Sequence, residues 1–271
     1  MREIVGVKFK ENGKTENYYV PEDLKVEIGD DIVCEGPIGL QCGKIVAKTM
    51  EENENTEETT PLNPIIRLVT EKDIEKLVQN QEKARAAFLQ TQKIIKKYEL
   101  EMKLLEAEYS LDMQKLMFTF SAEDRVDFRE LLKELAQIFK VRIELRQVGI
   151  RDEVKLLGGL GPCGRIACCN LFLSDYGKVG IKMAKQQSLS LSPSKINGIC
   201  GKIMCCIAYE NETYVQNASV LPKINQKVKT PNGEGVVMYV NILEKKVTVK
   251  TLDGEGKLEE YRVEDLILNE Q

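Results

Sequence analysis

The sequence contains the nonapeptide Gly161-Pro-Cys-Gly-Arg-Ile-Ala-Cys-Cys169 and, 37 residues further on, a near-copy of it, Gly198-Ile-Cys-Gly-Lys-Ile-Met-Cys-Cys206. The glycine after the first cysteine, the cation after that glycine and the isoleucine that follows all recur in place. Six of the eight cysteines of the chain therefore lie within 44 residues. Thiols gathered in this way are typical of a site for a metal ion or a metal cluster.

The composition predicts a soluble protein of more than one domain. The chain has 271 residues, of which 42% are hydrophobic and 30% charged, as in globular proteins. No uncharged apolar run approaches the about 18 residues that a membrane helix needs, and the first residues lack a secretory signal. We therefore expect a cytoplasmic protein without membrane insertion, in which clustered thiols serve as ligands or redox groups before they form disulfides.

The chain contains no histidine. This excludes Ser-His-Asp and Cys-His catalysis, mixed Cys/His zinc fingers and the usual imidazole base of acid–base enzymes. We therefore expect a protein that is not an enzyme.

Charge is distributed unevenly along the chain. The net charge is −4, but residues 155–206 carry seven cations against the single anion Asp175, so this segment has +6 and the remainder −10. Such asymmetry predicts an anionic partner for the cysteine region, although the cations also suit the neutralisation of thiolates and of an anionic cluster. The candidate residues for contact with a nucleic acid or a partner are Arg165, Lys178, Lys182, Lys185, Lys195 and Lys202.

Residues 1–60 are predicted to form a small β-barrel followed by an acidic loop. Two strand-like segments, Ile4–Phe9 and Tyr18–Val20, flank the hairpin signal Asn12-Gly13. A second pair, Asp31–Cys34 and Gly43–Ala47, is joined through a Gly/Pro-rich turn, and a small barrel is the natural product of such strands. Residues 51–60 are acidic and have no apolar period, which predicts a solvated loop.

Residues 61–155 are predicted to form a long helix and a β-β-α-β unit. The helix covers residues 71–98, and its buried face is expected to consist of Ile74, Leu77, Ala84, Phe88, Ile95 and Tyr98. Two strands, 102–109 and 116–120, precede a helix whose start is marked by the capping-box pattern Ser121-Ala-Glu-Asp124. Alternation over residues 141–145 predicts the last strand.

The remaining chain divides into the doubled cysteine region, residues 156–215, and a β-rich end, residues 216–271. Valine-rich segments from Val228 to Val249, broken by Pro231-Asn-Gly233 and Asp253-Gly254, predict a second small barrel of the SH3 type. The fold class is therefore α+β.

Helix geometry limits how each cysteine triplet presents its thiols. At about 100° per residue, Cys168 would lie about 140° around a helix from Cys163, so Cys163 must lie in a turn, which the neighbouring glycines favour. Adjacent cysteines point to different sides, so each copy offers two inward thiolates and the two copies four.

Four thiolates suit either a structural zinc ion or an iron–sulfur cluster. The C-x-x-C spacing of zinc ribbons is missing, whereas a gap of four residues occurs in plant-type ferredoxins, so the spacing leans towards iron–sulfur. Buried inert thiols and a redox disulfide pair stay open as alternatives. A dinucleotide site at Gly159-Leu-Gly161-Pro-Cys-Gly164 is disfavoured, because Pro162 and Cys163 occupy the turn that should face the pyrophosphate.

Several long strings of the sequence resemble the YaaT/RicT family, which carries the C-terminal homology domain named after a yeast polymerase-suppressor protein. The resemblance is dense from about Leu100 to Tyr209 and rests on four strings: Arg125-Val-Asp-Phe-Arg-Glu-Leu131, Arg142-Ile-Glu-Leu-Arg-Gln-Val-Gly-Ile-Arg-Asp-Glu-Val-Lys-Leu-Leu-Gly-Gly-Leu-Gly-Pro-Cys-Gly-Arg165, Lys182-Met-Ala-Lys-Gln-Gln-Ser-Leu-Ser-Leu-Ser-Pro193 and Lys195-Ile-Asn-Gly-Ile-Cys-Gly-Lys-Ile-Met-Cys-Cys206.

This resemblance implies a cytoplasmic, non-enzymatic bacterial regulator of sporulation, competence and biofilm formation. It implies a complex with two small helical proteins of the YlbF/YmcA type, a bound iron–sulfur cluster and an indirect effect on mRNA processing by ribonuclease Y. The candidate ligands that it carries over are Cys163, Cys168, Cys169, Cys200, Cys205 and Cys206.

We predict a four-iron–four-sulfur cluster held by Cys163, Cys168, Cys200 and Cys205, with zinc as the alternative. We expect any direct RNA contact to be weak, because Phe172 and Tyr176 are the only rings among the lysines of the region.

Overall fold

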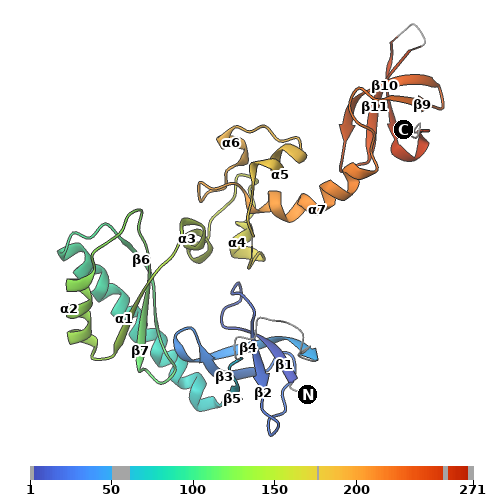
Figure 1. Cartoon of the computed structure of the whole chain (residues 1–271). Coiled ribbons are helices and arrows are strands. Elements are labelled where there is room, and N and C mark those ends of the chain that lie inside the picture. The colour runs from blue at the N-terminus through green and yellow to red at the C-terminus, as the bar shows by residue number, and fades with distance from the viewer. Residues whose placement is uncertain (1–2, 51–61, 176, 253–255, 268–271) are drawn as a thin grey trace. The chain divides into compact units, whose positions relative to one another are not determined.

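The computed structural model describes residues 3–50, 62–175, 177–252 and 256–267 (Figure 1). The chain divides into two compact units, Met1–Asp175 and Tyr176–Gln271, and it mixes helices and strands in the α+β manner predicted. The acidic loop predicted over residues 51–60 lies outside the described residues. No helix within the described ranges combines the length and the apolar composition needed to cross a membrane.

A curled five-stranded antiparallel sheet opens the first unit, with the strand order β2-β1-β4-β3-β5. Its strands are β1 (Glu3–Lys8), β2 (Glu16–Val20), β3 (Asp31–Gly36), β4 (Gly39–Met50) and β5 (Ile65–Leu68). The two edge strands meet at the Tyr19–Pro64 bridge, so the sheet forms a half-barrel around a core that includes Val5, Val7 and Ile32. The predicted hairpins are confirmed, whereas closure into a full barrel is not.

The second half of the first unit is the predicted β-β-α-β unit packed against the long helix. Strand β6 (Lys103–Tyr109) pairs antiparallel with β7 (Lys115–Ser121), which pairs parallel with β8 (Arg142–Gln147). Helices α1 (Glu71–Lys97) and α2 (Arg129–Phe139) contribute Ala87, Ile94, Ile95, Leu131 and Leu135 to a core with Leu104, Leu116 and Phe118 of the sheet.

The buried face of α1 differs from the prediction. Ile74 is 55% exposed, and the buried positions include the polar residues Asp73, Asn80 and Thr91. These positions lie inward because Asp73 binds the guanidinium of Arg67, and Asn80 Nδ2 donates to the carbonyl of Ser110 at 3.1 Å. An apolar stripe is therefore an incomplete guide when buried polar groups find partners.

The capping box predicted at Ser121 is wrong. Ser121 is the last residue of β7 and pairs with Lys103 of β6, while α2 begins eight positions later, at Arg129. Pairing between β6 and β7 thus includes Ser121, the residue that was predicted to cap the helix. A capping box does occur at the start of α1, where the N3 residue Asp73 accepts from the backbone N–H of Thr70 at 2.9 Å.

Short helices flank the two cysteine motifs. The first unit ends with α3 (Ile150–Leu157) and α4 (Cys168–Leu171), and the second begins with α5 (Ile181–Gln186), α6 (Pro193–Ile196) and α7 (Cys205–Ser219). The last three share a small core of Ala184, Ile196 and Ile207. The boundary between the units falls between the two motif copies.

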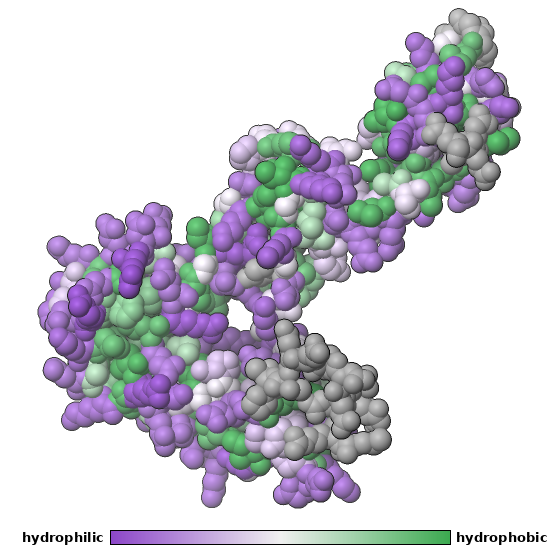
Figure 2. All heavy atoms as spheres, viewed as in Figure 1, coloured by the Kyte–Doolittle hydropathy of each residue, from purple (hydrophilic) through white to green (hydrophobic). Residues whose placement is uncertain are grey.

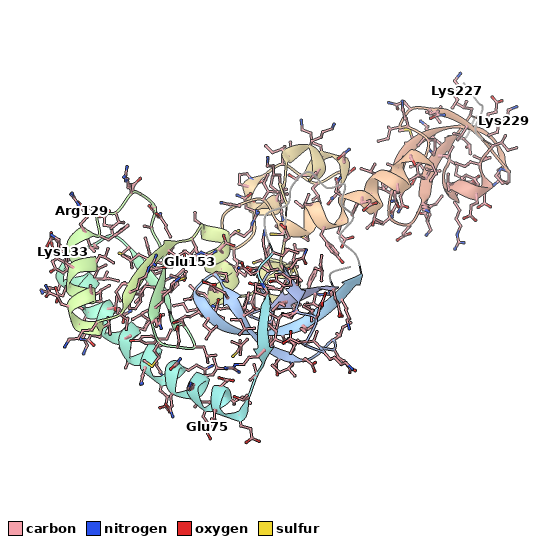
Figure 3. All side chains as sticks on the ribbon, turned by 60° about the horizontal axis from the view of Figure 1, so that its bottom comes forward. Glu75, Arg129, Lys133, Glu153, Lys227 and Lys229 are labelled. Atoms are coloured by element: carbon pink, nitrogen blue, oxygen red, sulfur yellow. The ribbon has the colours of Figure 1, made fainter. Side chains whose placement is uncertain are left out.

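The chain ends in a four-stranded antiparallel sheet with the order β12-β11-β10-β9. Its elements are β9 (Lys227–Thr230), β10 (Gly233–Asn241), β11 (Lys246–Thr251), β12 (Leu258–Arg262) and the 3₁₀ turn η1 (Val263–Asp265). Val228, Val237, Val247 and Val249 form its core. In the side-chain view, Lys227 and Lys229 project from β9 (Figure 3), as their exposure requires. The assignment to the SH3 type stays a prediction.

Candidate metal centre: two cysteine knuckles

The two motif copies fold into the same backbone structure. Residues 160–169 form the first knuckle and residues 197–206 the second. In the first, the N–H of Gly161 donates to the carbonyl of Arg165 at 2.8 Å, and the N–H of Gly164 to that of Gly161 at 2.9 Å. The corresponding bonds of the second knuckle are Gly198 to Lys202 and Gly201 to Gly198, both at 2.9 Å.

In each knuckle a β-bridge closes the turn, and a helix begins two residues after it. Isolated bridges join Leu160 to Ile166 and Asn197 to Ile203. The first cysteine of each motif, Cys163 or Cys200, consequently lies in the turn, as the helix geometry predicted. The adjacent pair opens α4 in one copy and α7 in the other.

Glycine is required at one position in each knuckle. Gly164 and Gly201 have φ of +79° and +73°, in the left-handed region that side chains rarely adopt. At the turn entrance, a Cβ on Gly161 would lie 3.4 Å from Sγ of Cys163, and one on Gly198 would lie 3.8 Å from Sγ of Cys200. These are ordinary van der Waals distances, so the positive φ of Gly164 and Gly201 is the feature that requires glycine.

The six thiols differ in accessibility. Cys163 is exposed and Cys168, Cys200 and Cys206 are half-buried, while Cys169 and Cys205 are 5% and 9% exposed. Within each adjacent pair one member is buried, as alternation predicted, but it is the second member in the first knuckle and the first member in the second. Cys168 and Cys205, the two favoured as ligands, are thus unequally exposed.

The donor set suits a soft metal centre. All eight cysteines are thiols, and each knuckle brings three of them to a glycine-rich turn and a helix start. Thiolate-only sets hold zinc or iron–sulfur clusters. Across the part of the chain that the structure describes, no three Cys, Asp or Glu side chains converge closely enough to form a complete site.

The cysteines outside the knuckles have a different environment. Cys34 is buried in β3 and Cys42 is half-buried in β4. Burial raises the pKa of Cys34 to about 12 and that of Cys42 to about 11. Both are therefore protonated at neutral pH and poor ligands.

The predicted contact cations are exposed. Arg165 and Lys202 occupy equivalent positions in the two turns, and the others, Lys178, Lys182, Lys185 and Lys195, lie in the second unit. Residues 177–209 contain five lysines and no acidic residue. Exposed apolar side chains such as Ile181 and Ile199 lie among them, and hydrophobic and hydrophilic residues adjoin over α5 and α6 in Figure 2.

Lys155, which contributes to the positive charge of the region, is held by the first unit. Its ammonium donates to the carbonyl of Ser174 at 3.1 Å, and burial lowers its pKa. It is therefore a structural residue rather than a contact for an external partner.

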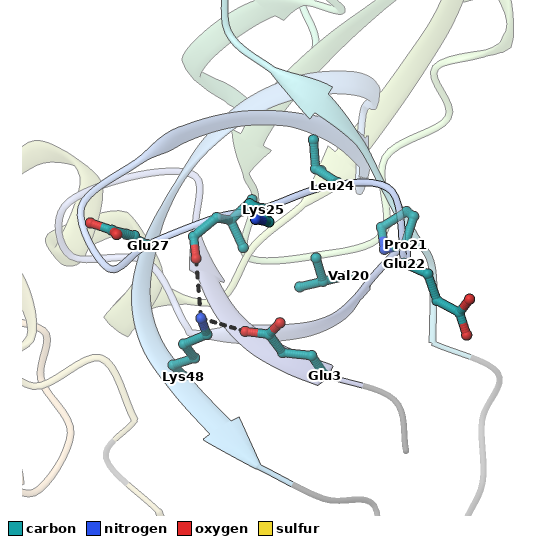
Figure 4. Close-up of a pocket in the computed structure, with 9 residues that line it drawn as sticks. Glu3, Val20, Pro21, Glu22, Leu24, Lys25, Glu27 and Lys48 are labelled. Carbon is teal, nitrogen blue, oxygen red and sulfur yellow. Dashed lines mark hydrogen bonds and ion pairs between the residues drawn. The ribbon is translucent and has the colours of Figure 1, made fainter.

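A hollow in the half-barrel is unrelated to the knuckles (Figure 4). It measures about 460 Å³ and is lined by residues of both signs, among them Glu22, Lys25 and Glu27. Lys48 crosses it, with contacts to Glu3 at 2.5 Å and to the carbonyl of Val26 at 3.1 Å. Since no cysteine lines this hollow, it adds nothing to the metal centre.

Two supporting residues were missed by the sequence interpretation. Asn12 Nδ2 donates to the carbonyl of Asn170, and Gln187 Nε2 donates to the carbonyl of Ile207 at 2.6 Å. Asn12 was noticed only as part of a hairpin turn. No sequence signal indicates a donor 158 positions away from its acceptor.

Two family descriptions match the chain: the PSP1 C-terminal conserved region over residues 63–148, and the third domain of PSP1-like proteins over residues 178–221. The stage 0 sporulation protein YaaT of Bacillus subtilis is 43% identical over 267 residues, which are 98% of this chain and 96% of YaaT. The protein PSP1 of Saccharomyces cerevisiae is 47% identical over 49 residues, 18% of this chain and 6% of that protein. No solved structure matches the chain.

Proposed function

The chain belongs to the YaaT/RicT family, whose Bacillus member is a sporulation protein, and we propose that it is a cytoplasmic, non-enzymatic regulatory subunit that binds an iron–sulfur cluster. The observation that carries the proposal is the pair of equivalent knuckles, each with three thiols at a glycine-rich turn. A duplicated, thiol-only donor set without histidine suits cluster chemistry better than hydrolysis.

The proposed cluster is of the four-iron–four-sulfur type. Its ligands are Cys163 and Cys200 from the turns and one member of each adjacent pair, Cys168 and Cys205. When bound, such a cluster supplies a redox-sensitive and oxygen-sensitive centre. The chain's own residues orient the thiolates, and Arg165 and Lys202 offset their negative charge.

The partners proposed are small helical proteins of the YlbF/YmcA type, and through them an effect on mRNA processing by ribonuclease Y during sporulation, competence and biofilm formation. A surface that mixes exposed lysines with exposed apolar residues, such as Lys182 beside Ile181, supports a protein partner of acidic, amphipathic character.

Anaerobic purification tests the cluster. We expect a brown protein with iron and acid-labile sulfide in equal amounts, and loss of both in Cys163→Ser and Cys200→Ser. The matched control is Cys42→Ser, which removes a half-buried thiol outside the knuckles and should leave the iron content unchanged. Stoichiometric zinc without sulfide would replace the iron–sulfur proposal by the zinc alternative.

The two remaining thiols, Cys169 and Cys206, test how the knuckles meet their partners. We propose that they serve a second ligand shared with the partner subunits, so that Cys169→Ser with Cys206→Ser should leave the chain folded and weaken the complex. Normal assembly and full iron content in this double variant would make both of them ordinary core cysteines.

The second candidate is a zinc-containing RNA-binding module, favoured by the five lysines and missing acids of residues 177–209. Binding through these lysines should weaken steeply with salt, because each phosphate contact releases counterions. A tight, sequence-selective complex with naked RNA at physiological salt would rank this candidate first.

A further inference from the structure

The two hydrogen bonds to Asn170 and Ile207 occupy equivalent places in the repeat. Asn170 directly follows the Cys168-Cys169 pair, and Ile207 directly follows the Cys205-Cys206 pair. Both are the third residue of the helix that the cysteines begin. In each knuckle, therefore, the carbonyl after the cysteine pair accepts a hydrogen bond from a side-chain amide.

The two donors come from different parts of the fold. Gln187 lies at the end of α5, 20 positions before its acceptor and in the same unit. Asn12 lies at the tip of the β1–β2 hairpin, 158 positions before its acceptor. The second knuckle is thus supported locally, and the first is supported by the N-terminal sheet.

The hairpin tip is itself anchored. Lys10 Nζ contacts Glu106 at 2.6 Å and Glu108 at 2.9 Å on β6. Burial alone would lower the pKa of Lys10, but the two carboxylates outweigh it and raise that pKa, so the lysine stays charged. The tip consequently has a fixed place from which Asn12 reaches α4.

The acceptor side is also fixed. Asn170 Nδ2 donates to the carbonyl of Lys155 in α3 at 2.8 Å. Glu153 of α3 contacts Lys103 of β6 at 2.7 Å and lies beside the β6-β7-β8 sheet in Figure 3. The Asn12–Asn170 bond therefore joins two anchored parts instead of two loose loops.

We propose that Asn12 and Gln187 are matched positioning residues, each of which holds the cysteine pair of one knuckle through the carbonyl that follows it. Asn12 ties Cys168 and Cys169 to the N-terminal sheet, and Gln187 ties Cys205 and Cys206 to α5. The role of Asn12 and Gln187 in ligand geometry rests on the proposed cluster. The two hydrogen bonds that hold the cysteine pairs do not depend on it.

The test compares thiol reactivity in the full-length, metal-free chain. The variants are Asn12→Ala and Gln187→Ala, each the matched control of the other, and pulse alkylation is followed cysteine by cysteine by mass spectrometry. Loss of one ordinary hydrogen bond should speed local opening about fivefold. We expect this acceleration at Cys169 in Asn12→Ala and at Cys205 in Gln187→Ala, with the other knuckle unchanged.

Two further variants separate hydrogen bonding from packing. Asn12→Asp and Gln187→Glu keep the side-chain size, but an ionised carboxylate cannot donate to the carbonyl oxygen and repels it, so these variants should accelerate labelling at least as much as the alanine variants. Equal acceleration in both knuckles would indicate general destabilisation and overturn the proposal, as would unchanged labelling in all four variants. Wild-type protein that binds no iron would refute the proposed function. The labelling experiment would still test the two hydrogen bonds, because it uses the metal-free chain.

Discussion

Asp73 provides a stability prediction that the structure makes quantitative. Its carboxylate accepts from Arg67 at 2.5 and 3.0 Å and from Thr70 at 2.9 and 2.7 Å, and its side chain is 3% exposed. Asp73→Ala removes a helix cap, worth about 1 kcal/mol, and charge-assisted bonds worth about 2 kcal/mol. Arg67 is 44% exposed and regains water, which keeps the loss below that of a fully buried pair. We expect a destabilisation of about 3 kcal/mol.

The pH dependence of this effect has a definite sign. The hydrogen bonds from Arg67 and then Thr70 hold the pKa of Asp73 far below its usual range. A depressed pKa contributes stability above the unfolded-state pKa of about 3.9 and loses it as the pH falls. The difference between wild type and Asp73→Ala should therefore be full at pH 7 and shrink by about 1.4 kcal/mol per pH unit below about pH 4.

Denaturant unfolding followed by circular dichroism measures this difference. The matched control is Asp127→Ala, because Asp127 also pairs with an arginine, Arg129 at 2.6 Å, and also has a lowered pKa, about 2, but both side chains are exposed. Exposed pairs contribute little, so this variant should behave as wild type. If Asp73→Ala were as stable as Asp127→Ala, or if its deficit did not shrink in acid, the account of a buried capping network would be refuted.

Two further substitutions, each paired with a control, test buried polar groups and backbone strain. Thr91 is fully buried in α1 and, among the described residues, its Oγ1 has no hydrogen-bond partner. Thr91→Val should therefore stabilise the chain by about 1 kcal/mol in the same assay. Its control, Thr230→Val, removes a hydrogen bond to the carbonyl of Gly233 at 2.8 Å and should destabilise the chain. Gly201→Ala meets no neighbour but forces a left-handed φ of +73°, so it should cost about 1–2 kcal/mol and lower the metal content; Gly180→Ala, also without a neighbour and at φ −115°, should leave both unchanged.

Local signals were sufficient for most strands and for the long helix, but they did not indicate the edge strand β5 (Ile65–Leu68). The Asn12-Gly13 hairpin, the strands around Gly39 and the span of α1 follow from alternation, turn residues and apolar period, and each occurs where these signals place it. The same signals failed wherever a distant partner decides. Asn80 is buried on α1 because carbonyls 30 and 31 positions away accept its amide protons, and nothing in the helix sequence shows this.

In the cysteine site, too, the features set by local sequence were predicted and those set by distant contacts were not. The turn at Cys163 and Cys200 follows from helix geometry and glycine placement, which are local, and both turns form. The buried member of each pair depends on what packs against the helix start, which is not local: Ile207 enters the apolar cluster of Ala184 and Ile196, whereas its counterpart Asn170 binds α3 and the hairpin. Two motifs of nearly the same sequence are therefore held in unequal surroundings.

The different contacts that hold the two knuckles have a consequence for the duplicated motif. Two identical knuckles with identical supports would lose their ligand geometry together, under the same perturbation. One carbonyl accepts from Gln187, 20 positions away, and the other from the N-terminal hairpin, 158 positions away. A change in the N-terminal half-barrel can therefore reach the first cysteine pair through a hydrogen bond that has no counterpart from this sheet in the second knuckle. In the regulatory subunit proposed above, one of the two cysteine pairs would then be coupled to the N-terminal sheet.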